Sequence, residues 1–430
     1  MERAFELSTE KTGQSFSQCM GNSFRQTVAG IFSDQRMNET VMLEGHLSST
    51  KSRISQLEGE YLLVAQDTTY YNYSGHHSME GLGKIQGKVK GIMQHNLLCI
   101  SDLGVPLGLL GQEYWSREST KEYEGKESQK WEKGLNIVND ELGNIAKKVV
   151  LIQDREADIF SFFQSHREPS VELLVRVHQP RNLEIIESGE IGNLESCNHH
   201  LPIIGKKRVS IFRDGKEITL LLRLQSGRVN VLKDKKDLSE SKKTQNLSLI
   251  IATEIDAFDQ SGKSVFNQEN HAQWYLLTSL SADNEESISR IVGFYALRWR
   301  IERLHYTLKS GGLNVEKLQF DDLQTAINAL SFYSVVAWQI LAIVYLTRHH
   351  KDEAITLCFE QKDVLVLESI SNKTLKTVKD GTLALAKLAE FAPSKRQPMP
   401  GIKVLAQAIE RFYYIKLGFN AKTIIKPLQD

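Results

Sequence analysis

The stretch YALRWRIERLHYTLK, residues 295–309, carries two neighbouring stripes of side chains when it is drawn as a helix. The apolar stripe, which suits docking on a core, consists of Leu297, Ile301, Leu304 and Leu308. The second arc, about 80° wide and next to the first, consists of Tyr295, Arg298, Glu302, His305 and Lys309. The stretch predicts a docked helix, starting near Ser281 or Asp283 and ending at residues 310–312, that holds a carboxylate among cations beside a buried seam.

Length and composition describe an ordinary globular protein. The chain has 430 residues, which predicts about two to four structural units rather than one core. It is 41% hydrophobic and 25% charged, with a formal net charge of zero. Bulk charge therefore gives no sign of a nucleic-acid binder, and any such site must be a local patch. The four cysteines lie far apart, which argues against a zinc module and suits a reducing cytoplasm.

Two features bear on membranes. The N-terminus MERAFELSTEKTG has no apolar segment, so no signal peptide is expected. The long apolar run at residues 327–346 is interrupted by Asn328, Ser331, Ser334 and Gln339. We therefore predict a buried core helix there rather than a membrane span, and a cytoplasmic protein with no membrane partner.

Two segments share one pattern, an apolar strand that runs into Gln-Asp. EYLLVAQDTTYYNYSG, residues 60–75, places Asp67 after the first such strand, and KKVVLIQDREADIFSFFQ, residues 147–164, places Asp154 after the second. Strand ends hold side chains at fixed positions, and a docked helix can bring Glu302 against them. Each acid also has an ordinary interpretation: a turn residue or N-cap for the aspartates, and an ion pair with Arg298 for Glu302.

A cluster of three carboxylates would need a cation, because like charges a few ångströms apart repel one another. Oxygen ligands without Cys or His favour Mg²⁺ or Mn²⁺ over Zn²⁺. Two such ions about 3.5–4 Å apart could polarise a phosphodiester and activate a water or a sugar hydroxyl. Arg298 and Lys309 would then hold phosphates, and Tyr295 could donate a hydrogen bond to one.

The spacing Tyr-x2-Arg-x3-Glu-x6-Lys at Tyr295, Arg298, Glu302 and Lys309 resembles the signature of the bacterial insertion-sequence family-four transposases. The segments QDTTYYNYSGHHSMEGLG at residues 66–83 and QDREADIF at 153–160 are similar to the family's other two acidic motifs. The resemblance implies an α/β fold: an RNase H-like catalytic core of mixed sheet and flanking helices, a β-rich insertion, and helical N- and C-terminal regions.

The same resemblance suggests a division of the chain. Residues 1–58 would form a shortened helical DNA-binding region, 59–177 the first part of the catalytic core, and 178–273 the β-rich insertion. Residues 274–350 would complete the core with the signature helix, and 351–430 would form a helical dimerisation region. The β-rich texture from residue 171 to residue 280 is independent of the resemblance, because short alternating runs are separated there by polar turns.

The resemblance also implies an activity, namely metal-dependent cleavage at transposon ends and strand transfer into target DNA. Its ligands for Mg²⁺ or Mn²⁺, two ions in number, would be Asp67, Asp154 and Glu302. Its partners would be double-stranded DNA, as transposon end repeats and target, and a second copy of the chain in a homodimer. The expected DNA contacts are Tyr295, Arg298, Lys309, Trp274, Arg176, Arg300 and Trp299. Trp274 would stack on a flipped base, although core packing explains this residue equally well.

Other functions remain open on the sequence alone. The short leader suggests a truncated, non-catalytic protein that binds DNA or forms mixed dimers as a regulator. The same acids would also serve a nuclease that hydrolyses strands without joining them. A glycosidase carboxylate pair is more remote, because it leaves the cationic helix face without a role.

Overall fold

The computed structural model describes residues 30–213, 216–233, 243–244, 246–395 and 397–424. Within these ranges the core is one mixed sheet of twelve strands. Its first half is built from β1 (Tyr61–Asn72), β2 (Lys84–Gln86), β3 (Val89–Ser101), β4 (Pro106–Trp115), β5 (Lys148–Gln153) and β6 (Val171–Val177). β1 pairs antiparallel with β3 and parallel with β5, β4 pairs antiparallel with β3, and β6 continues parallel to β5. The order β4-β3-β1-β5-β6 confirms the expected α/β class with an RNase H-like mixed sheet.

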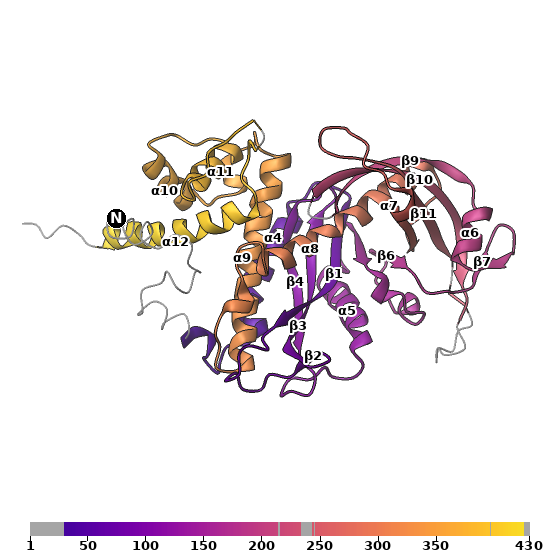
Figure 1. Ribbon diagram of the computed structural model, residues 1–430, viewed down its shortest axis with the longest axis horizontal. Coiled ribbons are helices and arrows are strands. Elements are labelled where there is room, and N and C mark those ends of the chain that lie inside the picture. Colours follow the sequence, from indigo (N-terminus) through magenta and orange to yellow (C-terminus); the bar gives the residue numbers. More distant parts are fainter. Residues whose placement is uncertain (1–29, 214–215, 234–242, 245, 396, 425–430) are drawn as a thin grey trace, which may run out of the picture.

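The β-rich segment that follows β6 in the chain extends this sheet. Its elements are β7 (Leu183–Ile185), β8 (Ile191–Gly192), α6 (Leu194–His200), β9 (Ile203–Arg213), β10 (Lys216–Val231) and β11 (Leu247–Phe258). β12 (Gln273–Thr278) joins the two halves, because it pairs with β11 on one side and with β6 on the other. The strands of this β-rich segment therefore form the end of the sheet far from β4 (Figure 1).

The two faces of the sheet are covered by different helices. Along β1, Leu62 and Val64 pack in one apolar cluster with residues of α5 (Lys130–Leu142). Leu63 and Ala65 pack in the other cluster, with residues of α7 (Glu285–Leu297), α8 (Trp299–Leu308) and α9 (Leu323–His349). Because side chains alternate along a strand, residue parity decides which helices a β1 side chain meets.

The signature stretch forms two abutting helices rather than one. α7 ends at Leu297 and α8 begins at Trp299, with Arg298 between them in helical backbone geometry (φ −51°, ψ −32°). The N-cap of α7 is Asn284, whose side chain accepts from the backbone N–H of Ser287. The expected caps Ser281 and Asp283 were therefore wrong by one to three residues, because Ser287 completes a capping box only with Asn284.

The remaining described helices pack around α9. They are α4 (Glu39–Ser55), α10 (Gln361–Ser371), α11 (Val378–Lys387) and α12 (Ile402–Ile424). In Figure 1, α10 to α12 lie beside α9 on the side away from the sheet. Among the described residues, α9 is the one helix long and apolar enough to cross a membrane, with a mean hydropathy of 1.8, and 67% of its most apolar window is buried inside the protein. It contacts α4, α8 and β4.

Candidate active site

Strand alternation places the two aspartates on the face of the sheet that α8 covers. Asp67 has the parity of Leu63 and Ala65, and Asp154 has that of Val150 and Ile152, all of which belong to the α7–α9 cluster. Asp154 follows β5 directly and caps the short helix Arg155–Ala157, accepting a 2.6 Å hydrogen bond from the Arg155 N–H. Asp67, in contrast, lies inside β1, opposite Asn96 of β3. The expectation that its strand ends before Asp67 was wrong.

Arg298 brings the three acids together. Its Nη1 lies 3.6 Å from Oδ2 of Asp67, and its Nη2 lies 3.7 Å from Oδ2 of Asp154. Nη2 also donates a hydrogen bond to Oε1 of Glu302, one helical turn along. Only 6% of the Arg298 side chain is exposed, whereas Asp67, Asp154 and Glu302 keep 22%, 28% and 28%. The acids from β1, β5 and α8 thus form one cluster around a buried guanidinium, open to solvent at the carboxylates.

The cluster holds more negative charge than Arg298 can neutralise. Burial and the charge of Asp154 together raise the pKa of Asp67 to about 6, although Arg298 opposes the rise. Burial also raises the pKa of Glu302 to about 7, again against Arg298 and reinforced by Asp67 and Asp154. The pKa of Arg298 itself is raised by the surrounding carboxylates despite its burial. In chemical terms the site therefore favours an additional cation or bound protons.

The donor set fits a hard divalent cation by its chemistry, because it consists of three carboxylates without sulfur. The geometry is not yet that of a metal site. Among the described residues no group of three or more His, Cys, Asp and Glu side chains lies close enough together to hold a metal ion. The guanidinium of Arg298 occupies the space between the acids instead, and its Nη1 is buried without a hydrogen-bond partner. Binding of a cation would therefore require Arg298 to shift.

Tyr295 and Trp274, two of the expected DNA contacts, lie beside this cluster. Tyr295 is buried, and burial raises the pKa of its hydroxyl, while the charges of Arg298 and Arg176 oppose the rise. The Trp274 ring meets Tyr295 edge-on with a centroid distance of 5.1 Å, and Trp274 is only 5% exposed. Stacking of a base on Trp274 would require this ring to be uncovered.

Replacing Trp274 by Ala is expected to lower the free energy of unfolding by about 3–5 kcal/mol, because it empties a buried aromatic site in the sheet face. Urea denaturation measures this loss. Trp299→Ala serves as the control, since Trp299 is only partly buried and should cost less. Equal losses in the two variants would contradict a core role for Trp274.

The other expected DNA contacts are spread along α8. Lys309 ends the helix, about 10 Å along the axis from Glu302; its Nζ lies 5.6 Å from the ring centroid of Tyr71, and burial lowers its pKa. Arg300 faces away from the acids. It donates to the Gly104 carbonyl at 3.1 Å and to the Tyr345 hydroxyl at 3.0 Å. The structure therefore brings Arg298 to the acids, with Tyr295 next to it and Arg176 next to Tyr295. It leaves Arg300 in contacts that hold α8 to its neighbours.

The sequence interpretation assigned no role to two residues at the site. His305 shares the polar arc of Glu302, and its Nδ1 lies 3.8 Å from Oδ2 of Asp67. Its Nε2 lies 3.1 Å from the amide nitrogen of Asn96, the residue opposite Asp67 in the sheet. The helical arc already contained His305, and its spacing from Glu302 is the signal for its place at the site. Asn96 follows only from the pairing register of β1 and β3.

Comparison with known proteins adds little to this geometry. No protein-family model matches the chain. Among solved structures, the chain is similar to "Cryo-EM structure of piggyBac transposase synaptic complex with hairpin DNA (SNHP)". The likeness covers 99% of this chain and 72% of that one, at 10% sequence identity and a TM-score of 0.38. A likeness at this level carries no argument about activity.

Proposed function

We propose that this protein is a DNA transposase, which cuts transposon ends and joins them to target DNA in a metal-dependent reaction. The observation that carries the proposal is the convergence of Asp67, Asp154 and Glu302, from two strands and a helix of an RNase H-like sheet, on Arg298. The proposal includes a homodimer on double-stranded DNA in the bacterial cytoplasm. It rests on the site and on the Tyr-Arg-Glu-Lys spacing.

The residues of the site have distinct parts in this reaction. Asp67, Asp154 and Glu302 would hold one or two Mg²⁺ or Mn²⁺ ions, which supply Lewis acidity at the scissile phosphodiester and activate the attacking oxygen. Arg298 has a donor at Nη1 without a partner, so it can hydrogen bond to a phosphate oxygen. Lys309 would contact the DNA backbone farther along α8. Tyr295 would position Arg298, which lies three residues later in the chain and close to the Tyr295 hydroxyl.

One alternative is favoured by a specific observation. The guanidinium of Arg298 already stands between the three carboxylates, and no group of metal-binding side chains is formed among the described residues. A chain locked in this arrangement would bind DNA and dimerise without cutting, as a regulator. Cleavage by the purified protein would exclude this alternative.

A strand-joining assay separates the candidate functions. The purified protein is incubated with DNA carrying the two ends of its own element, a target plasmid, and Mg²⁺. We expect products in which an end is covalently joined to the target. Cut but unjoined ends would identify a nuclease, and binding without cleavage would identify the regulator.

Mn²⁺ is expected to stabilise the protein more at about pH 8 than at about pH 5, because protons compete with the ion for Asp67 and Glu302, whose pKa values are raised to about 6 and about 7. The midpoint of thermal unfolding with and without Mn²⁺ measures this difference. The Asp67→Asn variant should lose the stabilisation at both pH values. A Mn²⁺ effect that is equal at both pH values, or that survives in Asp67→Asn, would place the ion elsewhere.

A further inference from the structure

His305 of α8 is a buried histidine whose two ring nitrogens face different groups. Its Nδ1 lies 3.8 Å from Oδ2 of Asp67, and its Nε2 lies 3.1 Å from Nδ2 of Asn96. The amide nitrogen of Asn96 is a donor, so a ring nitrogen that accepts from it carries no proton. In this arrangement the imidazole is neutral and has a single proton on its other nitrogen.

The hydrogen bonds behind Asn96 determine which nitrogen that is. Nε2 of Gln112 donates to Oδ1 of Asn96 at 2.8 Å, so the amide nitrogen of Asn96 points to His305. That amide is a donor, so Nε2 of His305 must accept. The proton then resides on Nδ1, which faces the Asp67 carboxylate. The reverse orientation of the amides would leave a bare Nδ1 lone pair against a carboxylate and is disfavoured by repulsion.

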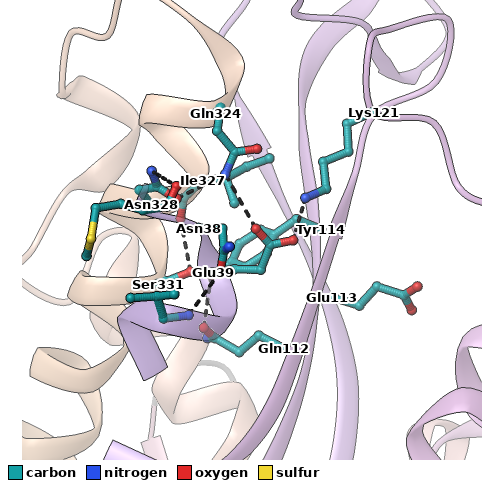
Figure 2. Close-up of polar contacts among 12 residues, drawn as sticks. Asn38, Glu39, Gln112, Glu113, Tyr114, Lys121, Gln324, Ile327, Asn328 and Ser331 are labelled. Atoms are coloured by element: carbon teal, nitrogen blue, oxygen red, sulfur yellow. Dashed lines mark hydrogen bonds and ion pairs between the residues drawn. The ribbon is translucent and has the colours of Figure 1, made fainter. Parts of the chain in front are cut away.

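The far end of this chain of hydrogen bonds is anchored on α9. Oε1 of Gln112 accepts from the Tyr114 hydroxyl at 3.1 Å, and that hydroxyl accepts from Ser331 at 3.0 Å. Figure 2 shows Gln112, Tyr114 and Ser331 in this arrangement, where β4 packs against α9. Nε2 of Gln94 also donates to the Tyr114 hydroxyl at 2.7 Å. The single proton of Ser331 faces both the Tyr114 hydroxyl and the Ile327 carbonyl, at 3.0 Å each. When Ser331 and Gln94 both donate to Tyr114, Tyr114 donates to Gln112, and this direction of the chain turns the amide nitrogen of Asn96 toward His305.

We propose that His305 is a positioning residue for the proposed reaction, in which its Nδ1–H, held by the Asn96–Gln112–Tyr114 chain, orients the Asp67 carboxylate toward Glu302 and Asp154. This inference rests on the proposed function. The 3.8 Å distance lies just outside a hydrogen bond, and contacts of this kind commonly tighten when the site is loaded. The arrangement resembles other sites in which a partner fixes the orientation of a ligating side chain, where removing the partner costs affinity or activity.

The tautomer of His305 tests the geometry without any bound cation. Two-dimensional ¹⁵N NMR of the full chain with labelled imidazoles, in EDTA, distinguishes Nδ1–H from Nε2–H, and His305→Asn assigns the signal. We expect the Nδ1–H tautomer. An Nε2–H tautomer or a doubly protonated ring would overturn the proposal.

Two substitutions separate a positioning role from a structural one. His305→Asn places an amide nitrogen near the position of Nδ1, whereas His305→Gln places it near Nε2. We expect His305→Asn to keep most of the cleavage rate and Mn²⁺ affinity, and His305→Gln to lose roughly 10–100-fold in each. Electron paramagnetic resonance of bound Mn²⁺ gives the affinity independently of DNA. Equal losses in both variants would overturn the positioning role.

Asn328→Leu provides a control for general loss of a buried amide. Asn328 donates to the Phe32 carbonyl at 2.8 Å and lies outside the chain from Tyr114 to Asp67. This variant should lose stability but keep the His305 tautomer and the Mn²⁺ affinity. A wild-type protein that neither binds Mn²⁺ nor cleaves DNA would refute the proposed function itself, whereas equal losses in the two His305 variants of an active protein would refute only the positioning role.

Discussion

Glu302→Gln is expected to make the protein more stable and inactive at the same time. The pKa of Glu302 is raised to about 7, so the fold disfavours the charged form. Between about pH 4.5 and pH 7 the folded state binds a proton that the unfolded state has released, and stability falls as pH rises through this window. A neutral Gln removes the penalty, so we expect a gain on the order of 1–3 kcal/mol at about pH 8 in EDTA.

The same substitution removes a carboxylate that the proposed reaction needs. We expect metal-dependent cleavage to fall by roughly a thousandfold or more, because the charge that would hold the cation is lost. Urea denaturation at several pH values measures the stability, and plasmid cleavage measures the activity. Glu286→Gln is the control: Glu286 also lies four residues from an arginine, Arg290, but its side chain is 88% exposed. Loss of stability in Glu302→Gln at about pH 8 would contradict the electrostatic account of the cluster.

Arg298→Met is expected to be strongly destabilising near neutral pH. Arg298 is buried and faces Asp67, Asp154 and Glu302 at once. Removing it leaves these carboxylates without their partner, at a cost of about 3–5 kcal/mol near neutral pH. Arg298 opposes the rise in the pKa of Asp67 and Glu302, so both pKa values should rise further in the variant. Stability should then recover as pH falls toward about 5, because the acids become protonated.

Arg300→Met isolates this effect from ordinary loss of packing. Arg300 is a neighbouring, partly buried arginine, and its hydrogen bonds go to the Gly104 carbonyl and the Tyr345 hydroxyl rather than to acids. We expect it to lower stability with a smaller change between about pH 5 and pH 8 than Arg298→Met shows, because Arg300 helps to lower the pKa of His349 but burial is the larger cause of that shift. If the two variants changed equally with pH, the acids would not be held by Arg298.

Much of the site could be predicted from local patterns. The repeated Gln-Asp after an apolar strand indicated Asp67 and Asp154, and strand alternation puts both on the face that α8 covers. The helical arc placed Glu302 four residues after Arg298. The predicted end of β1 was wrong because the polar side chains after Asp67 suggested a turn. Thr and Tyr are good strand formers, and β1 in fact continues in pairing with β3 as far as Asn72.

Other parts of the site could not be read from one sequence. The contacts of Arg298 with Asp67 and Asp154 join segments far apart in the chain, and no local spacing encodes them. The chain through Asn96 and Gln112 depends on the register between β1, β3 and β4, which the turns and bulges set. Arg300 is an exception, because residues two apart on a helix point to different sides, so the sequence itself separates Arg300 from Arg298 and Glu302.

Metal-dependent cleavage of a supercoiled plasmid that carries both ends of the source element tests the central claim most directly. The purified chain, with Mg²⁺, Mn²⁺ or EDTA, is compared with Asp67→Asn, Asp154→Asn and Glu302→Gln. The account predicts excision by the wild-type protein with either ion, none in EDTA, and none by any of the three variants. Excision that persists in EDTA, or in any of the three variants with either ion, would contradict a catalytic site built from these carboxylates.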